Sequence, residues 1–145
     1  MKKMLLLMFA FLILVLSVTS FADETKPDQK VDQLSGTIKG LVADVLMTDQ
    51  LAIAEGVEVV VSHIVVPPNT TLPVHWHHGE EFVYVLEGSA VLWLKGKPEI
   101  SMKKGDIYKI PLKETHTAKT TDEQATVIVF RVHEEGKPVR VLADE

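Results

Sequence analysis

The stretch NTTLPVHWHHGEEFVYVLEG, from Asn69 to Gly88, decides the fold that we expect of this chain. It contains two histidines separated by one residue, His75 and His77. On a β-strand, side chains two residues apart point to the same face, so both imidazoles can reach one point. Trp76 and His78 then point away, and we expect His78 to be solvated or to support the ligands beside it.

Glu81 opens the apolar run that follows, four residues after His77. If Glu81 faces the interior, Val83 and Val85 face it as well, because they share its parity. An isolated carboxylate in an apolar lining is costly, and either a metal or a paired cation relieves that cost. Both alternatives remain open from the residues alone.

Short β-rich runs broken by turn residues surround this stretch, and no helical stripe is visible after residue 36. Regularly spaced strands of this kind indicate an all-β sandwich or barrel. Gly96-Lys97-Pro98 between two of the runs is typical of a hairpin. The expected strands are Val57–Val66, Phe82–Glu87, Ala90–Lys95, Glu99–Met102, Ile107–Ile110 and Ala125–His133.

The run Val57–Val66 is apolar on both faces, unlike a strand with one face in water. One face is expected to line a barrel, and a second sheet layer or a second subunit would cover the other, so a homodimer is one expectation. His63 has a parity that could face the interior, where we expect a satisfied core or interface histidine rather than a ligand. His133, next to two glutamates, is expected at the surface.

Residues 1–22 have the layout of a secretory signal peptide. Lys2 and Lys3 precede an uncharged apolar run from Met4 to Val18, and small residues stand at Ser20 and Ala22. The alternative is an uncleaved membrane anchor, but the run is shorter than the ~20 residues that a spanning helix needs. We therefore expect an exported protein, periplasmic or secreted and off the membrane after cleavage, with 23–36 as a polar linker or arm.

The totals limit the function classes. The 145 residues carry 20 acidic and 15 basic side chains, and no basic cluster is present, so a nucleic-acid partner is not expected. The absence of cysteine excludes disulfides and thiolate metal ligands.

His116 follows the turn between Gly105 and Pro111, and a returning strand could bring it to the other two histidines. Three imidazoles and a carboxylate would suit one divalent Fe, Mn, Ni, Cu or Zn ion.

Two motifs in the chain resemble those of the cupin superfamily. The first, G(X)5HXH(X)3,4E(X)6G, matches at His75, His77, Glu81 and Gly88, with Asn69 in place of the first glycine. Asn tolerates the left-handed conformation better than most residues, so that turn can survive.

The second motif, G(X)5PXG(X)2H(X)3N, matches at Gly105, Pro111 and His116, while Lys113 and Thr120 depart from it. The resemblance implies a small antiparallel jelly-roll β-barrel over 37–145, often dimeric. It also implies metal ligation by His75, His77, Glu81 and His116.

The resemblance leaves two hypotheses about function. The first is a metal-dependent enzyme, oxygenase-like by family analogy, that acts on a small organic substrate. The second is a non-catalytic module that binds a metal or a small ligand. The residues name no general acid or base, since Tyr84 and Glu80 have the outward parity and spacing cannot fix Tyr108. Catalytic residues are therefore not assigned.

Overall fold

The computed structural model describes residues 37–144, so the predicted signal peptide and linker lie outside the described residues. Within that range the chain forms strands and no helix, which confirms the all-β prediction; accordingly, none of the described segments is a helix that could span a membrane. The strands are β1 (Val42–Gln50), β2 (Val57–Val66), β3 (His75–Trp76), β4 (Gly79–Glu87), β5 (Ser89–Leu94), β6 (Ile100–Lys103), β7 (Ile107–Ile110), β8 (His116–Lys119), β9 (Ala125–Glu134) and β10 (Val141–Leu142).

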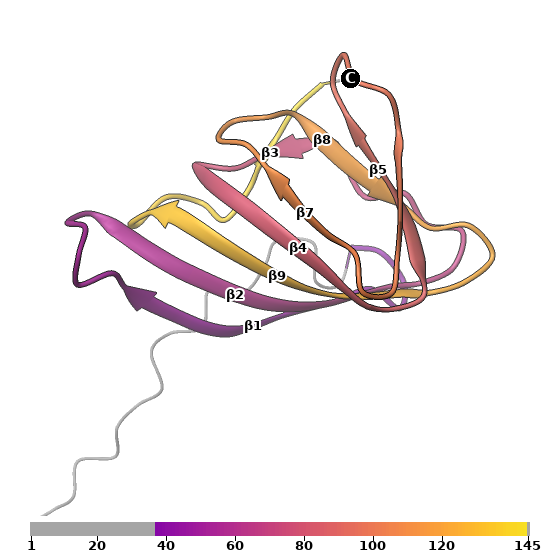
Figure 1. The fold of residues 1–145 in the computed structure, drawn as a ribbon, viewed down its shortest axis with the longest axis horizontal. Helices are drawn as coiled ribbons and strands as arrows, with labels where there is room; N and C mark the ends of the chain where they lie inside the picture. Colours follow the sequence, from indigo (N-terminus) through magenta and orange to yellow (C-terminus); the bar gives the residue numbers. More distant parts are fainter. Residues whose placement is uncertain (1–36, 145) are drawn as a thin grey trace, which may run out of the picture.

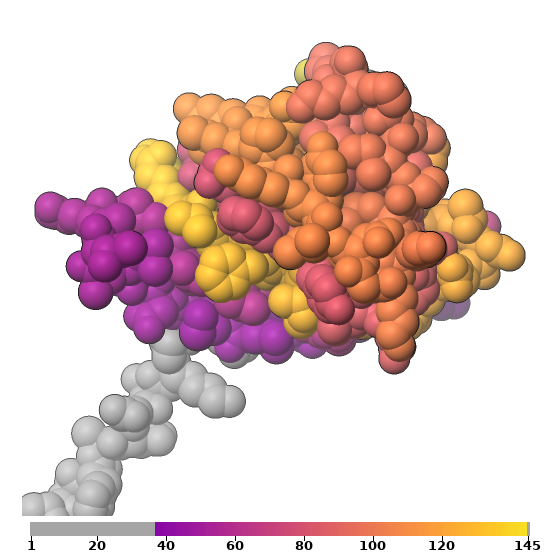
Figure 2. All heavy atoms as spheres, in the orientation of Figure 1, coloured from indigo at the N-terminus to yellow at the C-terminus, as the bar shows by residue number. Residues whose placement is uncertain are grey.

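The strands make two five-stranded antiparallel sheets. The larger has the order β1-β2-β9-β4-β7, and the smaller has the order β10-β3-β8-β5-β6 (Figure 1). Apart from β1–β2 and β5–β6, neighbouring strands are not consecutive in sequence, as β9 lies between β2 and β4. The chain thus passes back and forth between the two sheets, as a jelly roll requires, and side chains fill the space between the ribbons (Figure 2).

The hydrophobic core lies between the sheets and draws on both. β-Branched residues on the inner face of the larger sheet meet Leu and Met side chains of the smaller one. Burying such a side chain stabilises the fold by roughly 1.5–3 kcal/mol. The buried core consists of Leu41, Ala43, Ile64, Val66, Leu72, Val85, Leu92, Leu94, Met102, Ile110, Val127 and Val129.

The inner face of β2 is formed by the residues of the other parity from His63. Ser62, Ile64 and Val66 are buried, and the latter two line the interior cavity. His63 lies half-buried on the outer face, opposite Asp44 and Ile128 of the neighbouring strands. The suggested interior parity of His63 is therefore wrong, because a strand apolar on both faces gives no signal for which face is inside.

Several strands that complete the fold escaped sequence prediction. β1 carries exposed and polar residues, whereas β8 and β10 have only four and two residues. The hairpin at Gly96-Lys97-Pro98 is confirmed, since β5 pairs with β6. Strands that are very short, or that carry no clear alternation, are specified by their partners rather than by their own pattern.

Two of the turns hold non-glycine residues in the left-handed region. Asn69 has φ 53° and Lys113 has φ 58°, and these are two positions where the motifs expect glycine. The prediction that Asn69 preserves its turn is confirmed. Gly88 also has a positive φ, and a Cβ there would collide with the carbonyl oxygen of Gln124, so this position needs glycine.

Candidate metal centre

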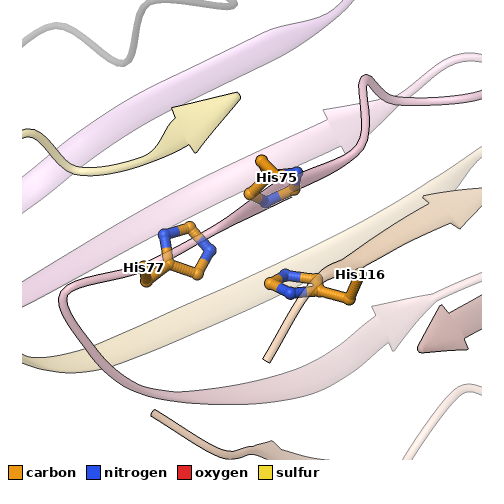
Figure 3. A group of neighbouring side chains, drawn as sticks. All are labelled: His75, His77 and His116. Carbon is orange, nitrogen blue, oxygen red and sulfur yellow. The ribbon is translucent and has the colours of Figure 1, made fainter. Parts of the chain in front are cut away.

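Three buried histidines converge at one end of the interior. His75 in β3 is the register partner of His116 in β8, and His77 follows β3 directly. Their candidate ligand nitrogens all lie within 4.8 Å of one another, and the three rings point toward one another (Figure 3). Ring centroids are 4.4 Å apart for His75 and His116, and 4.8 Å for His75 and His77. The predicted convergence of the three imidazoles is thus present.

Backbone carbonyls orient the three rings. The Nδ1 atoms of His75, His77 and His116 lie within hydrogen-bond distance of the carbonyl oxygens of Pro73, Val139 and Glu114, respectively. A ring that donates from Nδ1 presents a bare Nε2, which is how metal-binding histidines are commonly held. The Nε2 atoms of His77 and His116 are buried without a hydrogen-bond partner. These two orphaned nitrogens fit a metal.

Burial keeps the imidazoles of His75 and His116 neutral. Desolvation lowers the pKa of His75 to about 2, assisted by the charges of His116 and Arg140. Burial likewise lowers the pKa of His116, although Glu81 opposes this effect. Metal ligation requires the neutral ring, so both side chains are in the binding form at neutral pH.

Glu81 points inward as predicted, but its nearest cationic partner is an arginine. Arg131 Nε donates to Glu81 Oε2 at 2.7 Å, and His77 Nε2 lies 2.8 Å from the same oxygen. Burial would raise the pKa of Glu81, but the Arg131 guanidinium and His77 outweigh it and hold the pKa well below its usual range. Of the two alternatives left open by the sequence, the paired cation is present, and ligation of a metal by Glu81 stays a prediction.

The contact between His77 and Glu81 itself points to a cation. Both ring nitrogens of His77 face an acceptor, the Val139 carbonyl at Nδ1 and Glu81 Oε2 at 2.8 Å from Nε2. A tautomer with its proton on Nδ1 would set the Nε2 lone pair against the carboxylate, and the two acceptors would repel each other. A metal ion between or beside them would remove that repulsion. Among the described residues, the convergent metal-binding group comprises the three histidines and not Glu81.

Arg131 and Arg140 were missed by sequence reasoning. Their side chains are only 1% and 4% exposed, and both residues line the cavity beside the histidines. Arg131 also donates to Ser62 Oγ at 3.3 Å. Strand parity could have revealed Arg131, because it lies on the same face of the run Ala125–His133 as the inward-pointing valines. For Arg140, which precedes a two-residue strand, the sequence carried no such signal.

His133 is not at the surface, which corrects its prediction. It is 1% exposed and faces inward on β9, with Nδ1 3.7 Å from the buried carboxylate of Glu58. Burial lowers its pKa. The adjacent glutamates suggested solvent, but the strand extends through this position. His78 is half-buried, and its ring lies tilted against that of Trp76, with the centroids 4.6 Å apart.

An apolar cavity of about 60 Å³ adjoins the histidines. Val83 and Val85 line it, as predicted from the parity of Glu81, while Tyr84 points outward and is 42% exposed. Tyr108 packs against the hydrophobic core, which settles its orientation. The titratable or charged side chains of the lining are His75, Glu81, His116, Arg131 and Arg140.

Solved structures share this architecture at low sequence identity. A DMSP lyase, DddQ from Ruegeria pomeroyi, has a TM-score of 0.56 and 24% identity over 59% of this chain and 43% of its own. An RmlC-like cupin with a double-stranded β-helix fold from Methanocaldococcus jannaschii has a TM-score of 0.57 and 18% identity over 67% of this chain and 84% of its own.

An oxalate oxidase in complex with glycolate has a TM-score of 0.52 and 19% identity over 59% of this chain and 46% of its own. This chain therefore spans less than half of the length of the lyase or the oxidase. At such identities the three likenesses establish the fold, which is the predicted jelly-roll barrel.

Among proteins of curated function, none matches the chain. A model of the cupin domain matches residues 62–141, which is more than half of the sequence and contains all three histidines. The match, the double-stranded β-helix and the convergent imidazoles agree with the two motifs in the sequence. The chain belongs to the cupin family.

Proposed function

We propose that this protein is a metal-dependent enzyme, oxygenase-like, that acts on a small organic substrate. One observation carries the proposal: three buried imidazoles converge beside a cavity whose lining is mostly aliphatic. Such a donor set suits divalent Fe, Mn, Ni, Cu or Zn. The lyase and the oxidase of similar fold indicate that this architecture can support enzymes acting on small molecules.

The chain's own side chains have distinct tasks in this proposal. His75, His77 and His116 would hold the metal, and Glu81 is the candidate fourth ligand. When bound, such a metal supplies a Lewis acid and open coordination positions. The apolar lining excludes water and would orient the carbon portion of a substrate. Glu81, kept ionised beside Arg131, holds an acceptor at the site for a proton or a metal.

The alternative function is a non-catalytic cupin that binds a metal or a small ligand. A specific observation favours it: in the cavity as described, the lining contains no tyrosine, lysine or second carboxylate. An enzyme that moves protons needs a group to accept them, and here Glu81 alone is available. This shortage of proton acceptors favours the non-catalytic module. Among enzyme reactions, it favours oxygen chemistry over a lyase or isomerase reaction.

Export and assembly remain parts of the proposal. The apolar segment within 1–22 supports export to the periplasm or the medium. The outer face of the larger sheet supports a homodimer, because Tyr84, Ile107 and Phe130 are exposed there. Burial of that face in a second copy would remove apolar surface from water.

Metal analysis followed by an oxygen-uptake screen tests the proposal. We expect protein purified after native export to carry close to one equivalent of a transition metal. We also expect one or more small organic compounds to drive oxygen consumption. Failure to bind any metal under any loading condition would overturn the enzyme and would leave only a module that binds a small ligand without metal. Bound metal and ligand-induced stabilisation without turnover would replace the enzyme with the binding module.

A further inference from the structure

Glu81 lies where two cations would compete for it, a buried arginine and the ion of the proposed metal centre. Arg131 Nε donates to Glu81 Oε2 at 2.7 Å, and His77 Nε2 lies 2.8 Å from the same oxygen. The other carboxylate oxygen, Oε1, lies 3.9 Å from His116 Nε2. The oxygen in contact with His77 is therefore the one that the guanidinium already holds.

The fold fixes Arg131 against Glu81. The two residues are register partners on the neighbouring strands β9 and β4. Arg131 Nη1 also donates to Ser62 Oγ of β2 at 3.3 Å, so a third strand helps to hold the guanidinium in place. All three side chains are buried, and a charge-assisted hydrogen bond is strong where water is excluded. A metal ion that coordinates Glu81 must therefore weaken an existing strong contact.

We infer that Arg131 is a positioning residue, which competes with the metal for Glu81 and thereby limits how tightly the centre binds its ion. This inference rests on the proposed function, because it concerns the metal centre of that function. In the described part of the chain the convergent group consists of the three imidazoles, and Glu81 joins it only by sharing or releasing its contact with Arg131. While Arg131 holds Glu81, the metal keeps one more coordination position open for a small molecule.

The variant Arg131→Met removes the competing cation and leaves an unbranched apolar side chain in its place. We expect its Zn²⁺ affinity, measured by competition with a chelator, to rise at least about tenfold, the scale on which groups around metal ligands alter binding. The matched control is Lys109→Met, which removes a cation paired with Glu80 on the outer face of the same sheet. The control should keep the parental Zn²⁺ affinity. Parental or weaker affinity in folded Arg131→Met would overturn the inference.

Loss of a positive charge would also favour a metal ion through reduced repulsion alone. Arg131→Met is therefore compared in two backgrounds, the parent and Glu81→Gln. Reduced repulsion gives the same gain in Zn²⁺ affinity in both backgrounds, whereas competition for the carboxylate gives a larger gain when Glu81 is present. We expect the larger gain in the parent background. Equal gains would show that Arg131 acts through its charge and not through Glu81, and would overturn the inference.

Co²⁺ in place of Zn²⁺ gives a second readout, because its visible absorption depends on its ligands and their geometry. We expect the Co²⁺ spectrum of Arg131→Met to differ from that of the parent, since Glu81 then joins the metal. Glu81→Gln and the double variant Arg131→Met/Glu81→Gln should share one spectrum. A role of Arg131 in packing alone would not give a spectral change that depends on Glu81. An unchanged spectrum in Arg131→Met would count against the inference.

A conservative variant decides the inference if Arg131→Met fails to fold. Arg131→Lys keeps the positive charge but replaces the planar fork of donors by a single ammonium group, which holds Glu81 less firmly. We expect its Zn²⁺ affinity to lie above that of the parent and below that of Arg131→Met. Unchanged affinity in Arg131→Lys, with Arg131→Met unfolded, would overturn the inference.

The inference and the proposed function fail in different ways. If the parent binds Zn²⁺ and Arg131→Met binds it no more tightly, the metal centre stands and the competition is wrong. If Arg131→Met binds Zn²⁺ and the parent does not, the competition stands and the metal-dependent function of the unaltered chain is wrong. If neither protein binds Zn²⁺, both are wrong.

Discussion

The inner face of the larger sheet is divided into an apolar half and a polar half along the same strands. On β4 and β9, Val85 lies opposite Val127, and Val83 opposite Val129. Further along the same face, the paired positions hold charged or titratable residues and one glycine. They are Glu81 opposite Arg131, Gly79 opposite His133, and, across β2 and β9, Glu58 opposite His133.

The difference shows that one face of a sheet can stabilise the fold at one end and bear chemistry at the other. The apolar half stabilises through burial, which needs only suitable volume and hydrophobicity. The polar half keeps charges in a low dielectric, where each depends on its partner. We expect substitutions in the polar half to be costly in a specific, partner-dependent way, and those in the apolar half to be mild when volume is nearly conserved.

Loss of a metal-binding histidine should have the largest effect. Disturbing the groups that merely orient a ligand weakens metal binding 10–100-fold, so His77→Ala should weaken it by more than ~100-fold. Competition with a chelator of known affinity measures this. The control is His78→Ala, which removes the adjacent, half-buried imidazole that lies outside the cluster. Equal losses in the two variants would contradict the assignment of the centre.

Breaking the buried ion pair should be the largest effect on stability. Arg131→Met leaves Glu81 as an uncompensated buried charge, which costs about 3–5 kcal/mol of unfolding free energy. The apolar half gives the contrast, since Ile110→Val should cost only about 1 kcal/mol. Denaturant unfolding of the metal-free protein measures both.

A double variant separates loss of the partner from loss of packing. If the cost of Arg131→Met arises from the unpaired carboxylate, adding Glu81→Gln should recover a substantial part of it. Strictly additive destabilisation in Arg131→Met/Glu81→Gln would show instead that Arg131 acts through packing alone.

Acidification should destabilise the metal-free protein before any carboxylate titrates. His75 has an ordinary pKa of 6.5 but a folded pKa of about 2, so between these values the unfolded chain binds a proton that the folded one does not. Stability therefore falls as pH decreases below 6.5, by about 2 kcal/mol at pH 5 from His75 alone.

Unfolding of the metal-free protein at pH 7 and pH 5 checks this slope. In His75→Gln the free energy of unfolding should fall by about 2 kcal/mol less between pH 7 and pH 5 than in the parent. His116 should account for part of the fall that remains. An identical loss in the parent and the variant would show that His75 is not held neutral by the fold.

The sequence predicted the fold where a strand carries its own pattern. Val57–Val66 and Ile107–Ile110 coincide with β2 and β7, and the two motifs indicated the jelly roll. It could not predict strands whose pairing is imposed by neighbours, such as β1, nor which face of β2 lies inside. Periodicity records that both faces are apolar but not where the rest of the chain packs.

For the candidate site, local spacing in the sequence predicted which nearby histidines converge, but not which residues from distant strands pair with them. His75 and His77 follow from the strand period, and His116 from the second motif. The pairing of Glu81 with Arg131 joins residues fifty positions apart through the register of β4 and β9. The charge balance of the centre therefore depends on tertiary structure, even though its ligands could be named from the sequence.

The smallest expected effect concerns the backbone at the polar end, in the loop that leads to β8. Lys113 adopts φ 58° and donates its backbone N–H to the carbonyl of His77 at 3.3 Å. A left-handed conformation costs a residue with a Cβ about 1 kcal/mol relative to glycine, so Lys113→Gly should stabilise the protein by up to that amount. The matched control is Lys104→Gly, an exposed lysine without a positive φ, where added chain entropy should destabilise instead. If both variants shift the melting temperature in the same direction, the strain at Lys113 is absent. If they diverge, the fold tolerates strain in the backbone that positions His77, at the end of the barrel where the buried charges also lie.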